Sequence, residues 1–133
     1  LADVLSRSLF FAEWRLRRRS LDAIPIFEMD QGAHWFPNVP RHNIITCFDV
    51  LEHMEGDAQK RLLTWMGETA DLVFVNCIVD ASHPGMHLAV DVEDLAKHVQ
   101  QSWPAEVSDF YPDKNGKPRQ HLLLYGPGVS YAA

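Results

Sequence analysis

Short apolar runs alternate along the chain with longer stretches in which apolar residues recur at helical spacing. Ile44 to Phe48 is a run of β-branched and aromatic residues that is too brief for a helix, and it predicts a strand buried on both faces of a parallel sheet. The nearly uninterrupted apolar run from Leu72 to Val79 predicts a second strand of this kind. Helical spacing predicts helices over residues 3–19, 57–70 and 92–101.

The two ends of the chain complete this pattern. Ile24 to Asp30 alternates apolar and polar residues and is a further strand candidate. Residues 105–111 and 119–126 flank Asn115-Gly116, a dipeptide that favours the tight turn of an antiparallel hairpin. Strands separated by helices predict an α/β fold, with a mostly parallel sheet, helices on both of its faces and a C-terminal antiparallel hairpin.

Ionisable residues directly follow the two central strands. Asp49 comes immediately after the first run, and Glu52 and His53 follow within one turn of a predicted helix. His83 and His87 lie in the loop after the second run. In open α/β sheets, ligands bind at the carboxyl ends of the strands, so these side chains predict a binding site at that edge.

One stretch carries a resemblance to a known family. The sequence Cys47-Phe48-Asp49-Val50-Leu51-Glu52-His53-Met54 resembles the fourth-strand motif of class I S-adenosylmethionine-dependent methyltransferases. In that family an apolar strand is followed by an acid, two aliphatic residues and Glu-His. The later helices, strand and closing hairpin keep the family's order, so the resemblance covers roughly residues 25 to 126. It implies a reduced Rossmann-like fold, S-adenosylmethionine as the cofactor, and methyl transfer as the activity.

The resemblance also implies roles for individual residues. The adenosine would lie near Asp30, and the methionine part of the cofactor near Phe48 and Asp49. His83 and His87 are candidates for the base that takes a proton from the methyl acceptor, a small molecule or a nucleic acid that the sequence does not identify. The full set of expected cofactor-binding residues is Glu28, Asp30, Gly32, Cys47, Phe48, Asp49, Glu52 and His53.

The start of the chain departs from the family pattern. A full-length member begins with a strand and a loop of the type Asp/Glu-x-Gly-x-Gly-x-Gly, but no glycine precedes Ile24 here. In one placement, residues 25–30 match the family's third strand, and Asp30 contacts the adenine amine. In the other they serve as the first strand, and residues 28–34 are a degenerate glycine loop that keeps only Gly32. The second placement gives the strand at residues 44–48 a neighbour, which a partner subunit could supply instead.

Further interpretations stay open beside the enzyme. Asp49, Glu52 and His53, with His87 from the loop, resemble the metal-binding pattern of small-RNA terminal 2′-O-methyltransferases, but Asp49 replaces the first glutamate, and we expect no metal. The absent glycine loop fits a non-catalytic methyltransferase-like module that binds or assembles with a partner. It also fits an enzyme whose cofactor site is completed across an oligomer interface.

Composition limits the class of protein. A length of 133 residues and 47% hydrophobic content predict a single domain, with a basic amphipathic helix over residues 1–20, a core over 24–126 and a tail over 127–133. Cys47 and Cys77 lack CxxC spacing, which argues against a zinc cage or a disulfide framework. The sequence shows neither an apolar run of membrane-spanning length nor a signal-peptide pattern, so we expect a soluble, cytoplasmic protein.

The net charge of −6 is unevenly distributed. Residues 1–20 carry five arginines against Asp3 and Glu13, a net charge of +3, which leaves −9 on the remainder. An acidic body binds nucleic acid poorly without specific contacts, because phosphate contacts dominate that affinity. If the chain forms a homo-oligomer or binds a partner subunit, we expect the contact to lie on the basic N-terminal helix or on an open edge of the sheet.

Overall fold

The computed structural model describes residues 2–4, 7–21, 23, 27–29, 34–78, 88–110 and 119–125. Contacts cluster into two compact units, Leu1–Asn38 and Val39–Ala133. Each unit is described by itself, and a single domain over residues 1–133 stays a prediction. No helix in the described ranges is long and apolar enough to cross a membrane.

The first unit consists of two short strands joined through a helix. The strands β1 (Ala2–Val4) and β2 (Phe27–Met29) pair in parallel, and α1 (Arg7–Arg18) lies between them in sequence. Asp3 pairs with Glu28 in this ladder, so the prediction that Asp3 begins the helix is wrong. Parallel strands need a crossover connection, usually a helix. A strand and helix preceding β2 agree with the placement of residues 25–30 as a third strand.

The aromatic residues of α1 lie on the surface. Leu9 is buried, whereas Phe11 and Trp14 are 55% and 54% exposed. Their rings stack at 5.6 Å between centroids. The guanidinium groups of Arg15 and Arg18 lie 5.7 Å from the centroids of the Phe11 and Trp14 rings. The exposed side of α1 therefore carries aromatic rings with arginine guanidinium groups placed over them.

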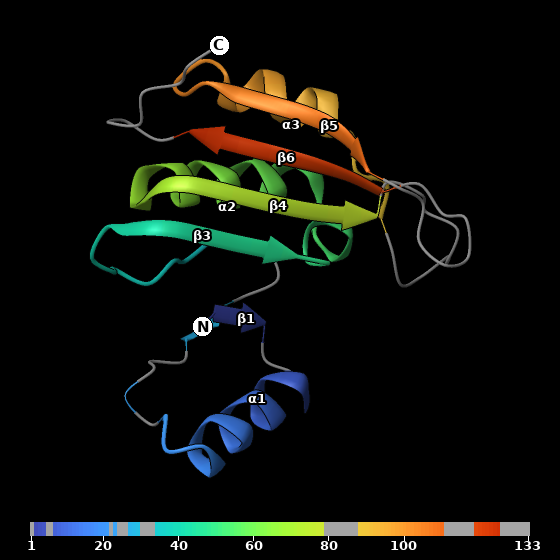
Figure 1. Cartoon of the computed structure of the whole chain (residues 1–133). Coiled ribbons are helices and arrows are strands. Elements are labelled where there is room, and N and C mark those ends of the chain that lie inside the picture. Colours follow the sequence, from blue (N-terminus) through green and yellow to red (C-terminus); the bar gives the residue numbers. More distant parts are fainter. Residues whose placement is uncertain are drawn as a thin grey trace. The chain divides into compact units, whose positions relative to one another are not determined.

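The second unit contains a four-stranded sheet with the strand order β3-β4-β6-β5 (Figure 1). Its elements in chain order are β3 (His42–Phe48), η1 (Leu51–His53), α2 (Gly56–Thr69), β4 (Ala70–Ile78), α3 (Val92–Val99), β5 (Ala105–Phe110) and β6 (Arg119–Tyr125). Strands β3 and β4 are parallel, whereas β6 is antiparallel to both β4 and β5. The predicted parallel pair and the closing hairpin are confirmed. The last strand of the hairpin inserts between β4 and β5.

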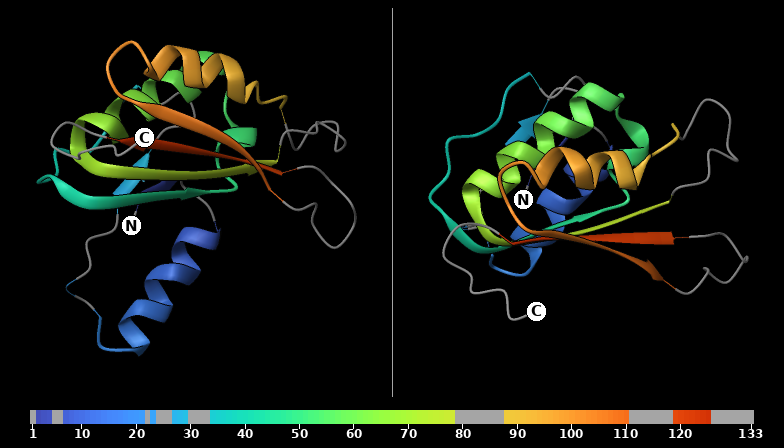
Figure 2. Two further views of the ribbon diagram at one scale, coloured as in Figure 1. Left: turned by 45° about the horizontal axis from the view of Figure 1, so that its top comes forward. Right: turned by 90° about the horizontal axis from the view of Figure 1, so that it is seen from above.

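Helices α2 and α3 cover the same face of this sheet (Figure 2). Every second residue of β4 points to that face, so Val73, Val75 and Cys77 are at most 1% exposed. Cys47 of β3 joins them, and both cysteines are free and buried, as the sequence predicts. The helices contribute Ala58, Leu62, Leu63, Met66, Val92, Leu95, Ala96 and Val99 to this core.

The opposite face of β3 is open. Ile44 is 54% exposed and Phe48 is 51% exposed, so the prediction of a strand buried on both faces is wrong. The physical reason is twofold. Among the described strands of this sheet β3 is an end strand that pairs with β4 alone, and both helices of the unit lie on one face. On the open face, the Phe48 ring lies 5.6 Å from that of Phe74.

Polar contacts fix the starts of these elements. Arg41 donates to Asp71 Oδ1 at 2.7 Å and to the Ala70 carbonyl at 2.7 Å, which ties the start of β3 to the start of β4. Asp91 caps α3 by accepting from the Asp94 amide at 2.9 Å. Asp57 is not the N-cap of α2, because Glu55 holds that position and Asp57 lies in the first turn.

One ion pair joins the two helices. Lys60 Nζ of α2 lies 2.8 Å from Asp94 Oδ2 of α3. The hydrogen bond to Asp94, and then its charge, raise the pKa of Lys60 above its usual value. The same contact with Lys60 lowers the pKa of Asp94. Asp94 is exposed and Lys60 is partly exposed, so solvent screens the pair and it contributes little to stability.

Candidate functional site

The carboxyl ends of β3 and β4 lie at the same edge of the sheet, where the sequence predicts a site (Figure 1). Phe48 pairs with Asn76 in the parallel ladder. The Asp49 amide then donates to the Asn76 carbonyl at 3.0 Å, so the ladder continues for one residue past the end of β3. Asn76 and Asp49 therefore lie next to each other at this edge.

Asp49 turns the chain away from the sheet. Its φ angle is 52°, in the left-handed region that residues other than glycine rarely adopt, although aspartate tolerates it better than most. The side chain is exposed. Strained backbone of this kind persists where surrounding structure enforces it and is concentrated at functional sites. The turn thus presents a carboxylate to solvent at the ligand-binding edge of an α/β sheet.

The residues after Asp49 form a separate 3₁₀ turn, η1, and not the first turn of a long helix. Leu51 and Glu52 are buried, whereas His53 is exposed. Gln59 of α2 holds this turn, because its side-chain amide donates to the Leu51 carbonyl at 2.8 Å and to the Met54 carbonyl at 2.9 Å.

Gln59 was missed by the sequence analysis. It is 3% exposed. A signal was present, since Gln59 falls at helical spacing with Leu62, Leu63 and Met66 on the buried stripe of α2. A polar residue on such a stripe needs a hydrogen-bond partner, and here the partners are the carbonyl groups of the site turn.

Glu52 has an unusual environment. Its side chain is 0% exposed, and neither carboxylate oxygen has a hydrogen-bond partner among the described residues. Its main-chain carbonyl accepts from the Leu88 amide at 2.6 Å, which joins η1 to the segment that leads into α3. Removing a polar group from water without a compensating hydrogen bond is unfavourable. The carboxylate of Glu52 is therefore a destabilising feature of this turn as described.

The structure does not bring all the predicted site residues together. Phe48, Asp49, Glu52 and His53 follow one another around the β3–η1 turn, and Cys47 lies buried on the helix-covered face. Glu28 belongs to β2 in the first unit. The remaining predicted residues, which are Asp30, Gly32, His83 and His87, lie outside the described residues.

Within the ranges that the structure describes, no group of three or more histidine, cysteine, aspartate or glutamate side chains could hold a metal ion. Asp49, Glu52 and His53 therefore do not form such a group by themselves. Burial explains this, because Glu52 is enclosed while Asp49 and His53 face solvent.

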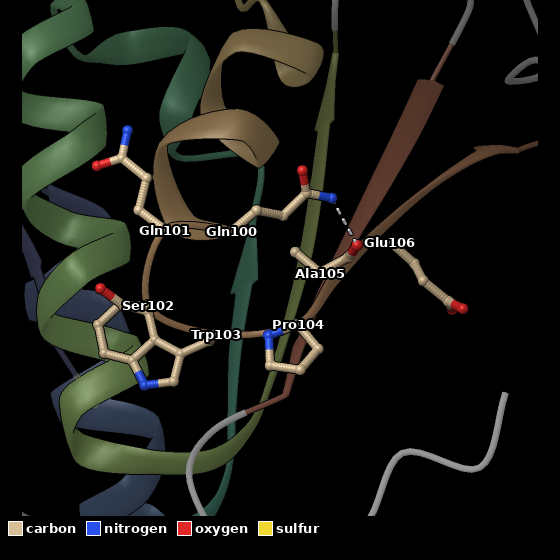
Figure 3. A pocket seen from close by; sticks show the side chains of 7 residues that line it. All are labelled: Gln100, Gln101, Ser102, Trp103, Pro104, Ala105 and Glu106. Atoms are coloured by element: carbon tan, nitrogen blue, oxygen red, sulfur yellow. Dashed lines mark hydrogen bonds between the residues drawn. The ribbon is translucent and has the colours of Figure 1, made fainter.

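A hollow of about 390 Å³ lies elsewhere, around the turn between α3 and β5 (Figure 3). It is lined by the consecutive residues 100–106, and Gln100 closes the turn by donating to the Ala105 carbonyl at 3.0 Å. Strand β5 runs parallel to β4, since both are antiparallel to β6. The hollow at its amino end is thus at the edge opposite to the β3–η1 turn and is not part of the candidate site.

The fold is similar to that of solved methyltransferase structures. The methyltransferase domain of bacterial CtHen1-C is similar to this chain with a TM-score of 0.64 at 14% identity, over 94% of this chain and 75% of that one. Magnesium protoporphyrin IX methyltransferase (ChlM) from Synechocystis PCC 6803 gives 0.67 at 13% identity, over 94% and 62%. This chain has the class I methyltransferase fold.

A third structure with this fold is N-methyltransferase NodS from Bradyrhizobium japonicum WM9, with a TM-score of 0.66 at 15% identity, over 95% of this chain and 65% of that one. Both NodS and ChlM were crystallised with S-adenosyl-L-homocysteine (SAH). The chain thus spans between 62% and 75% of the length of these three methyltransferase-fold proteins. No protein-family model and no curated protein sequence matches it.

Proposed function

We propose that this chain binds S-adenosylmethionine at the carboxyl edge of β3 and takes part in methyl transfer to an acceptor. The observation that carries the proposal is the β3–η1 turn. In a class I methyltransferase fold, this turn exposes the strained Asp49 beside Phe48, at the strand edge where α/β sheets bind ligands. Two proteins of the same fold bind SAH.

The residues of the turn fit the chemical parts of such a cofactor. S-adenosylmethionine supplies an electrophilic methyl group on a sulfonium, so the protein has mainly to position donor and acceptor. The exposed ring of Phe48 offers apolar surface, and the exposed carboxylate of Asp49 suits a cationic ammonium group. Phe48 and Asp49 would both hold the methionine part of the cofactor. Glu52 and His53 come next in the turn, and Cys47 lies on the helix-covered face of β3.

The other parts of the proposal rest on residues outside the turn. The resemblance of the motif implies that Asp30 would lie near the adenosine, with Glu28 and Gly32 also among the cofactor-binding residues. His83 or His87 would take the acceptor's proton where the acceptor requires a base. The acceptor is a small molecule or a nucleic acid.

Isothermal titration calorimetry with SAH tests the cofactor site. We expect the chain to bind SAH, and Asp49→Asn to weaken binding by about tenfold, since one charge-assisted contact is worth roughly 1.4 kcal/mol. Asparagine also tolerates the left-handed backbone, so this variant removes the charge and keeps the turn. Asp57→Asn is the matched control, because Asp57 is an exposed acid in the first turn of α2. Equal affinity of both variants would contradict the assignment of Asp49.

A second candidate function is a non-catalytic module of the same fold. What favours it is that two of the predicted cofactor-binding residues are not accessible, because Glu52 is enclosed in η1 and Cys47 is buried on the helix-covered face of β3. The same titration separates the two functions. At about 1 mM SAH, the titration detects binding free energies as weak as about 4 kcal/mol. Absence of binding at this concentration supports the non-catalytic module and contradicts the proposed enzymatic function. Binding that appears only as the protein associates supports a site shared between copies.

A further inference from the structure

The β3–η1 turn, residues 49–54, contains two unfavourable features. Asp49 has a left-handed backbone with a φ angle of 52°, which residues other than glycine rarely adopt. Glu52 is 0% exposed, and its carboxylate oxygens have no hydrogen-bond partner among the described residues. Backbone strain and an enclosed polar group persist only where the surrounding structure enforces them. Contacts from outside the turn must therefore hold it in this conformation.

These contacts come from three other parts of the second unit. At the start of the turn, the Asp49 amide donates to the Asn76 carbonyl of β4 at 3.0 Å. In its middle, the Glu52 carbonyl accepts from the Leu88 amide at 2.6 Å. Both are main-chain bonds, which do not depend on the identity of the side chains. The third contact is made by a side chain, that of Gln59 in α2.

The chemistry of Gln59 suits this contact. Its amide nitrogen carries two hydrogens, and it donates to the Leu51 carbonyl at 2.8 Å and to the Met54 carbonyl at 2.9 Å. One carbonyl belongs to the first residue of η1 and the other to the residue after its end. The two bonds therefore fix the path that the chain takes as it leaves Asp49. Gln59 is 3% exposed, so water competes little for these carbonyls.

We propose that Gln59 is a positioning residue, which holds Asp49 in the left-handed conformation that presents its carboxylate at the carboxyl edge of β3. This inference rests on the proposed function, because S-adenosylmethionine is the ligand to which the carboxylate is presented. Two hydrogen bonds and the strain of one left-handed residue have free energies of the same order, so loss of both bonds lets Asp49 return to extended backbone. Gln59 is buried, and it acts through the turn and not by contact with the cofactor.

Hydrogen exchange of the Asp49 amide, measured by NMR, reports on the turn without any ligand. We expect Gln59→Leu to accelerate this exchange by about tenfold, because local opening of the turn releases the bond to the Asn76 carbonyl. Val99→Ala is the matched control, since it removes buried apolar volume from α3 and lowers the stability of the fold. Val99 lies at the opposite edge of the sheet, where its carbonyl accepts from the Trp103 amide, so the control should leave exchange at Asp49 unchanged.

Calorimetry with SAH measures the consequence for the site. We expect Gln59→Leu to weaken binding by about tenfold, because only a fraction of the molecules then presents Asp49 correctly. Val99→Ala should bind SAH as the wild type does. If Gln59 acts through Asp49, the two losses are not additive, and the double variant Asp49→Asn/Gln59→Leu should bind about as well as Asp49→Asn alone.

Gln59→Glu separates the hydrogen bonds from packing, because it keeps the shape of the side chain. An ionised carboxylate has no donor for the two carbonyls, whereas the protonated acid has one O–H, and burial beside carbonyl oxygens favours the protonated form. The SAH affinity of this variant, relative to wild type at the same pH, should be low at about pH 7.5 and recover in part at about pH 5.5. The ratio cancels the pH dependence of the other ionisable groups of the turn, which both proteins share: Asp49, Glu52 and His53.

Three results would overturn the proposal: unchanged exchange of the Asp49 amide in Gln59→Leu, equal SAH affinity of this variant and the wild type, or additive losses in the double variant. Failure of the proposed function looks different, because the wild type itself would then bind no SAH. In that case exchange of the Asp49 amide alone decides whether Gln59 positions Asp49.

Discussion

Replacing the buried carboxylate of Glu52 should stabilise the protein. The side chain is 0% exposed and its oxygens have no hydrogen-bond partner among the described residues, so the folded state carries the cost of desolvating them. Such a group costs about 1–3 kcal/mol in proteins. Glu52→Met removes both oxygens and fills a similar volume with a flexible apolar side chain. We expect the free energy of unfolding to rise by about 1–3 kcal/mol, a shift of roughly 3–10 °C in Tm for a domain of this size.

Urea unfolding followed by circular dichroism at pH 7, without ligand, measures this change. Glu55→Met is the matched control, since Glu55 is an exposed acid three residues away and makes no side-chain cap bond to α2. Its effect should stay within about 0.5 kcal/mol, as at most surface positions. A loss of stability of more than 1 kcal/mol in Glu52→Met would refute the reasoning, because it would show that the fold provides the carboxylate with a partner.

Three further substitutions test contacts around the site and between the elements of the second unit. Gln59→Leu removes two buried hydrogen bonds, although the Leu51 carbonyl still accepts from the Met54 amide, and should lower the free energy of unfolding by about 1–3 kcal/mol in urea titrations. Gln100→Leu, at an exposed position with one bond, should cost less than about 1 kcal/mol. Arg41→Met should cost about 1 kcal/mol in the same titrations, because its contacts are part-exposed. The small gain from the Lys60–Asp94 pair depends on pH. The lowered pKa of Asp94 makes this gain present above pH 3.8 and lost as pH falls through the folded-state value, so melting curves of wild type and Lys60→Met should converge in acid and in high salt.

The strands and helices of the second unit could be predicted because their signals are local. The apolar runs that became β3 and β4, the helical stripes of α2 and α3, and the hairpin are properties of consecutive residues. Strand β1 was missed because three residues, Ala2 to Val4, are too few to show a period. The burial of β3 was predicted wrongly, since exposure depends on which elements pair with a strand and not on its own sequence.

The sequence predicted where the site residues lie in the fold, but it did not predict their burial or their backbone conformation. Asp49 was expected at the carboxyl end of a strand, and it is there, but its left-handed backbone has no sequence signal in an aspartate. Glu52 was expected within the first turn of a predicted helix, as a cofactor-binding residue. It is enclosed because η1 is a short 3₁₀ turn pulled toward α2 by Gln59. Such a contact between a turn and a later helix is visible only once the tertiary structure is known.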